Sequence, residues 1–238
     1  METLASCIKR TADIIENSNI GYWISRIKEL YNIDAVLYPG VTDGHIIFRH
    51  IYNILQPIPP ALIKDCGIKR LGIRADMGLN KPYYPNHGYF DMRDEVVLNA
   101  DIFYHPDVPD DFFDFRGYFI TRPQQTLLHE FSHAFDWANG NLSYKDGWTK
   151  LSGWSPKYKK GLKRLIINDK RAPKVVGEWF YDPKAEFTRF YAKRNPCDDW
   201  ADSSAFYLGK LRSKVPSKKL VYFDNIYKKY YNSNNILG

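Results

Sequence analysis

The chain has 238 residues, which is enough for one large domain with a substantial buried core and too long for a tiny disulfide-stapled fold. Hydrophobic residues make up 44% of it and charged residues 26%, a balance that excludes a disordered chain. The formal net charge of +7 is concentrated in the segment 157–174, which holds eight basic residues and the single acid Asp169. A nucleic-acid-binding surface spread over the protein is therefore not expected.

Membrane and disulfide-rich classes are also disfavoured. No window approaches the roughly 18 to 20 apolar residues of a membrane span, and no secretory signal is recognised at the start. Cys7, Cys66 and Cys197 are far apart with no CxxC pair, which argues against a disulfide framework or a thiolate metal cluster. We expect a monomer in the cytoplasm by default, with delivery by a non-classical route as the alternative.

Hydrophobic spacing predicts strands in the first half of the chain and mostly helices after Thr121. The predicted early elements are two helical pieces within 11–31 separated at Gly21, a strand at Ala35–Tyr38, a helix at His45–Leu55, a short helix around Leu62, strands at Ile68–Ile73 and Glu95–Asn99, and a loop at Asp76–Gly88. This order is typical of the α+β class. We expect a single domain over 1–238, with a helical part at 1–31, a sheet-containing lobe at 32–120 and a helical lobe at 121–238.

The most informative pattern is His129-Glu130-Phe131-Ser132-His133, within a predicted helix from Thr121 to Gly140. Residues four apart on a helix lie one above the other, so both histidines can present a ring nitrogen to one zinc ion. Glu130 is then close enough to take a proton from an attacking water. This HExxH pattern predicts a metallopeptidase site.

A third ligand has to come from one of two acidic segments downstream. One contains Glu186; the other follows the turn Asn195-Pro196 and places Asp198 and Asp202 four apart on a predicted helix. That spacing suits one carboxylate on the metal and a second behind it that accepts a hydrogen bond from a ligand histidine.

The stretches HEFSHAFDW (129–137) and FYAKRNPCDDWADSSAFYL (190–208) resemble the lethal-factor-like zinc metallopeptidases, which include the Pro-Pro endopeptidases. The resemblance implies a zincin-like α+β fold with a small mixed sheet, an active-site helix and a mostly helical C-terminal lobe. It also implies gluzincin-like chemistry, with Asp198 as third ligand, Asp202 behind the metal shell and Tyr191 as the residue that stabilises the transition state. The family usually has Glu where this chain has Asp198, so Glu186 and Asp199 remain alternative ligands.

These residues together predict a zinc-dependent endopeptidase acting on a peptide or protein, with Zn²⁺ held by His129, His133 and Asp198 and with Glu130 as general base. Tyr191 would donate a hydrogen bond to the oxyanion. The alternative is a catalytically silent protein of the same fold that docks its basic segment onto an acidic partner. For Glu95–Asn99, a substrate-binding sheet edge and an ordinary central strand both remain open. An amphipathic helix is predicted within 157–174.

Overall fold

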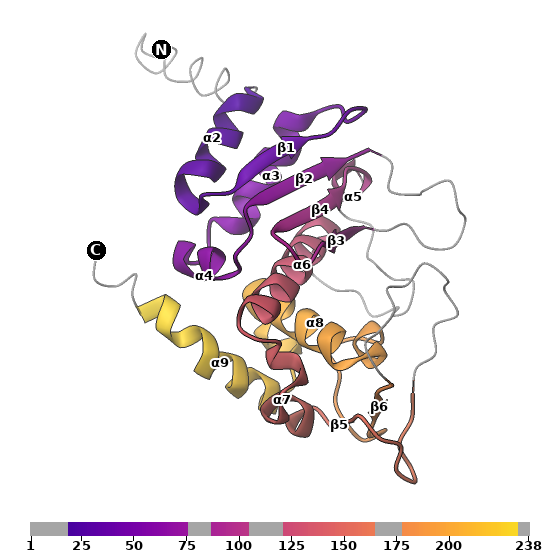
Figure 1. Ribbon diagram of the computed structural model, residues 1–238. Coiled ribbons are helices and arrows are strands. Elements are labelled where there is room, and N and C mark those ends of the chain that lie inside the picture. Colours follow the sequence, from indigo (N-terminus) through magenta and orange to yellow (C-terminus); the bar gives the residue numbers. More distant parts are fainter. Residues whose placement is uncertain (1–18, 76–86, 105–120, 165–177, 233–238) are drawn as a thin grey trace, which may run out of the picture.

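The computed structural model describes residues 19–75, 87–104, 121–164 and 178–232 (Figure 1). The elements of the first half are α2 (Ile20–Tyr31), β1 (Asp34–Leu37), α3 (Gly44–Leu55), α4 (Pro60–Asp65), β2 (Arg70–Arg74), β3 (Gly88–Phe90), β4 (Glu95–Asn99) and α5 (Asp101–Tyr104). Those of the second half are α6 (Arg122–Ala138), η1 (Leu142–Tyr144), α7 (Asp146–Leu151), β5 (Trp154–Ser155), β6 (Phe180–Tyr181), η2 (Tyr191–Arg194), α8 (Pro196–Leu208), η3 (Arg212–Lys214) and α9 (Ser217–Asn232). No helix among the described residues is long and apolar enough to cross a bilayer.

The larger sheet is small and mixed, as predicted. Its strand order is β1-β2-β4-β3, with β1, β2 and β4 parallel and β3 antiparallel to β4. The segment Glu95–Asn99 is therefore an interior strand, and the interpretation of it as a substrate-binding edge is wrong. Within the described residues, β3 forms the edge of the sheet on that side.

β3 lies directly against α6. A Cβ added at Gly88 would lie 2.9 Å from Thr126 Cγ2 and 2.9 Å from Leu98 Cδ2, closer than real Cβ atoms approach. Glycine at this position therefore lets the strand lie between β4 and the helix. Thr126 is three residues before His129, so the edge strand passes within one helical turn of the first histidine.

The start of α2 corrects one prediction. Asn19 caps the helix, because its Oδ1 accepts a hydrogen bond from the Gly21 backbone N–H at 2.9 Å. Gly21 therefore lies in the first turn of a helix that begins at Ile20, and it does not separate two pieces. The piece predicted before it lies outside the described residues.

α6 has almost the predicted extent. Pro123 stands in its first turn, where a missing N–H costs nothing, and the chain leaves the helix through Gly140 at φ +79°. Thr121 occupies the N-cap position, but its side chain makes no capping hydrogen bond. The helix packs against β3 and β4 on one side and against α8 on another, which places its middle in the interior of the protein.

Small polar residues hold α6, α8 and α9 together. Ser132 donates to Ser204 at 2.7 Å, and Ser204 lies 2.8 Å from the Tyr227 hydroxyl. All three side chains are fully buried, so this chain of hydroxyl groups joins the three helices within the core.

A buried ion pair ties the last helix to α8. Lys219 of α9 is 2% exposed and places Nζ 2.5 Å from Oδ1 of Asp199, which is 0% exposed. The other oxygen of Asp199 accepts a hydrogen bond from Trp154 Nε1 at 3.0 Å. The carboxylate of Asp199 thus contacts both α9 and β5, and both charges of the Lys219–Asp199 pair are shielded from water.

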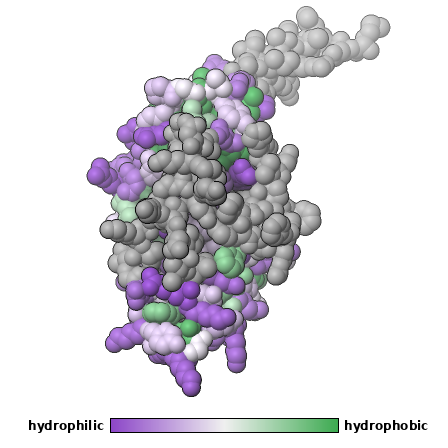
Figure 2. Space-filling model, turned by 90° about the vertical axis from the view of Figure 1, so that its right-hand side faces the viewer, coloured by the Kyte–Doolittle hydropathy of each residue, from purple (hydrophilic) through white to green (hydrophobic). Residues whose placement is uncertain are grey.

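The basic segment does not form the predicted helix in its described part, 157–164. Lys163 instead pairs with Tyr181 in an antiparallel bridge, and Arg164 forms an ion pair with Glu178 at 2.7 Å. Figure 2 shows hydrophilic side chains at the lower end of the molecule, at the height of β5 and β6 in Figure 1. Residues 165–174 lie outside the described part of the chain.

Candidate metal centre

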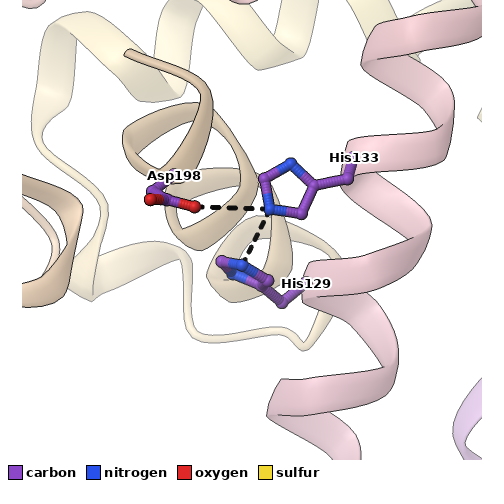
Figure 3. Close-up of side chains that lie close together, drawn as sticks. All are labelled: His129, His133 and Asp198. Carbon is purple, nitrogen blue, oxygen red and sulfur yellow. Dashed lines mark hydrogen bonds and ion pairs between the residues drawn. The ribbon is translucent and has the colours of Figure 1, made fainter. Parts of the chain in front are cut away.

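His129 and His133 face one another on α6. Their Nε2 atoms are 2.9 Å apart, and their ring planes are nearly perpendicular at 87° (Figure 3). The four-residue spacing explains why the two rings are neighbours, because side chains four apart on a helix occupy the same face. Each histidine therefore offers the same ring nitrogen to one point in space.

Asp198 reaches this point from the first turn of α8. Its Oδ1 lies 3.5 Å from His133 Nε2, and the ligand atoms of the three residues all lie within 4.8 Å of one another. Its Oδ2 accepts a hydrogen bond from Asn195 Nδ2 at 2.6 Å, and Asn195 also caps the helix by accepting from the Asp198 N–H. The capping residue thus turns the carboxylate so that its free oxygen faces the histidines.

The alternative ligands lie elsewhere. Glu186 is exposed, and the carboxylate of Asp199 is taken up by Lys219 and Trp154. Among the described residues, the group of histidines, cysteines and acids that could hold a metal consists of His129, His133 and Asp198.

Asp202 lies behind His129, four residues after Asp198 on α8. Its Oδ1 is 2.8 Å from His129 Nδ1, and Arg189 donates to both oxygens, from Nε at 2.8 Å and from Nη2 at 2.7 Å. Burial alone would raise the pKa of Asp202, but the charge of Arg189 and the contact with His129 lower it to about 2. Arg189 was not identified from the sequence, because nothing in its local pattern indicates that it pairs with residue 202.

The tautomer of a neutral His129 follows from this contact. An ionised Asp202 can only accept hydrogen bonds, so His129 donates from Nδ1, and in the neutral ring Nε2 then carries the lone pair. The lone pair points towards His133 and Asp198. Two imidazole nitrogens and one carboxylate oxygen that converge in this way form the donor set that zinc prefers, so the residues fit a metal ion.

Glu130 and Tyr191 lie beside this group. Glu130 is 8% exposed on α6, and Tyr191 of η2 has its ring centroid 6.2 Å from that of His129. The Tyr191 hydroxyl accepts a hydrogen bond from Arg194 Nη1, and burial raises the pKa of Tyr191, so the phenol keeps its proton. Because Arg194 can only donate, the proton of Tyr191 is available for another acceptor.

No protein-family model matches the chain, and no curated protein matches it either. Among solved structures, the chain is similar to a candidate zinc-binding metallo-peptidase from Bacteroides caccae, with 13% sequence identity and a TM-score of 0.44. The similarity covers 90% of this chain and 85% of that one. A similarity of that degree assigns neither a family nor an activity.

Proposed function

We propose that the chain is a zinc-dependent endopeptidase. The observation that carries the proposal is the convergence of His129, His133 and Asp198 next to the buried carboxylate of Glu130. A purely structural metal site has no need of a carboxylate in that position, whereas hydrolysis needs a general base there. In the described part of the basic segment, 157–164, no contact favours the alternative of a catalytically silent protein that docks on an acidic partner.

The residues have distinct roles in this proposal. His129, His133 and Asp198 would hold the zinc ion, which would supply Lewis acidity to a substrate carbonyl and to the attacking water. Glu130 accepts a proton from the water and passes it to the leaving amine. Tyr191, oriented by Arg194, donates its proton in a hydrogen bond to the oxyanion that develops at the carbonyl. Asp202 keeps His129 in the tautomer that the metal requires.

We further propose that an extended peptide binds along β3. The hydrogen bonds from Asn99 N to His87 O and from Asp91 N to Glu95 O mark residues 87 and 91 as paired with β4. In an antiparallel ladder, hydrogen-bonded and non-hydrogen-bonded residue pairs alternate. The backbone N–H and C=O groups of Gly88 and Phe90 therefore point away from β4. Within the described residues these groups have no strand partner, and they lie close to α6. A substrate strand could therefore pair here and present a peptide bond to the metal centre.

The strand-pairing proposal predicts a specific effect of Phe90→Pro. Proline removes the outward N–H of residue 90 and leaves the ladder with β4 unaffected, since that N–H does not point to β4. Loss of one substrate hydrogen bond should lower kcat/KM by about 3- to 10-fold relative to Phe90→Ala, which removes the same side-chain packing but keeps the N–H. Equal kcat/KM values for the two variants would exclude pairing at this position.

The function as a whole is tested on the unaltered protein. We expect about one zinc ion per chain by elemental analysis after mild dialysis, and zinc-dependent cleavage within a peptide library. Fragments with internal cleavage sites would distinguish an endopeptidase from an enzyme that trims ends. Protein that contains no zinc and takes up none on titration would overturn the proposal.

A further inference from the structure

The Nδ1 atoms of His129 and His133 contact different kinds of side chain. Behind His129 stands a carboxylate, whereas the Nδ1 atom of His133 lies 3.1 Å from the sulfur of Cys197. That sulfur lies in turn 3.8 Å from Oδ2 of Asp136. We infer that Cys197 is a positioning residue for the metal centre, which connects His133 to Asp136 through its thiol. The inference rests on the proposed metal site and adds a residue to it.

Asp136 is a fixed anchor for this connection. It is 1% exposed, its Oδ1 accepts from the Ser143 backbone N–H at 2.7 Å, and its Oδ2 accepts from the Ser143 hydroxyl at 2.6 Å. Asp136 stands three residues after His133 on α6, and Ser143 belongs to η1, which follows that helix. The carboxylate is thus held by the turn that ends the metal-binding helix.

The two neighbours of Cys197 call for a side chain that accepts a hydrogen bond on one side and donates one on the other. When His133 Nε2 binds a metal, Nδ1 carries the proton and must donate, and the sulfur of Cys197 is the acceptor beside it. The Asp136 carboxylate accepts, and the S–H group of Cys197 is oriented to supply a donor. Cysteine or serine can accept on one side and donate on the other, whereas alanine and valine can do neither.

The same contact also ties the first turn of α8 to α6. Cys197 is the residue immediately before Asp198, so a sulfur held between His133 and Asp136 also sets the position of the ligand carboxylate. Aspartate has a short side chain, so α8 has to lie close to α6 for the carboxylate of Asp198 to reach His133. The thiol contact holds α8 at that short distance and thereby acts on two ligands, His133 and Asp198.

The inference is tested by metal affinity, measured as competition for zinc between the full-length protein and a chelator. Cys197→Ala and Cys197→Val should lower zinc affinity by about 10- to 100-fold, the usual effect of losing a partner of a ligand histidine. Cys197→Ser, which keeps a donor and an acceptor, should restore affinity to within a few-fold of the unaltered protein. Valine fills the space that alanine leaves empty, so it tests the contact even if the cavity in the alanine variant impairs folding.

A second readout separates positioning from direct ligation. In the cobalt-substituted protein we expect no sulfur-to-metal charge-transfer band, because the sulfur contacts the ring nitrogen on the far side of His133 from Asp198. Such a band would overturn the inference by placing Cys197 in the ligand set. In the zinc-affinity measurement, Cys66→Ala is the control for loss of a buried thiol away from the metal centre, since Cys66 lies in the core and donates to Leu62 O.

The outcomes distinguish this inference from the proposed function. Unchanged zinc affinity in Cys197→Ala and Cys197→Val, in protein that binds zinc and cleaves peptides, would overturn the role of Cys197 alone. A serine variant as weak as the alanine variant would also overturn it, because the hydrogen bonds would then not be the cause. Absence of zinc binding in the unaltered protein would remove the proposed function and this inference with it.

Discussion

Replacement of Glu130 by glutamine should abolish most of the peptidase activity and leave the metal in place. Glutamine has nearly the same shape as glutamate but cannot accept the proton of the attacking water, so kcat should fall by roughly 10²- to 10⁴-fold. Glu130 is not one of the three converging ligands, so the zinc content and the thermal unfolding temperature should stay close to those of the unaltered protein. Steady-state kinetics on a peptide from the library, with zinc analysis of the same sample, measures both quantities.

The matched control is Glu186→Gln. Glu186 also loses its charge in this change, but it is exposed and stands outside the converging group. It should leave kcat and zinc content unchanged. An undiminished rate in Glu130→Gln, with zinc bound, would show that Glu130 is not the general base of the reaction.

Removal of Asp198 should have the largest effect on the metal itself. Asp198→Ala deletes one of three proposed ligands, so zinc affinity should fall by more than about 100-fold, beyond the effect of losing an outer partner. Asp202→Ala leaves the three ligands intact but frees the His129 ring, and should lower affinity by about 10- to 100-fold. Titration with zinc against a chelator of known affinity ranks the variants.

Glu186→Ala is the comparison that decides between the two acidic segments. Its zinc affinity should equal that of the unaltered protein, because its side chain is exposed and lies outside the group of converging atoms. If Glu186→Ala lost zinc and Asp198→Ala kept it, the ligand would be reassigned and the resemblance to the lethal-factor-like family would lose its basis at residues 190–208.

The parts of the molecule that follow from local spacing could be predicted. His129 and His133 lie on one face of α6 because they are four residues apart in a helix. Asp198 and Asp202 share a face for the same reason, once α8 begins at Pro196. Both helices have the predicted positions. The roles of these side chains, and of Glu130 and Tyr191, stay predictions, as do the zincin class and the single domain.

The parts that depend on distant pairing could not be predicted. A central and an edge strand of similar composition look alike in sequence, so the place of Glu95–Asn99 in the sheet depended on β3, a strand of three residues. The contacts of Asp202 with Arg189 and of Cys197 with His133 join different elements, and for Cys197 the two residues are 64 apart. Such contacts arise from helix packing, which the hydrophobic pattern does not specify.

The buried pair of Lys219 and Asp199 makes α9 part of the same cooperative unit as the metal centre. If α9 opened while α8 stayed in place, the carboxylate of Asp199 would be left buried without its counter-charge, so opening of α9 alone is strongly disfavoured. Asp199 follows Asp198 in the chain, and a disturbance of one carboxylate is passed along the backbone to the other. Amide hydrogens of the C-terminal helix should therefore exchange with solvent by the same opening event as those around the ligands, and bound metal should slow both.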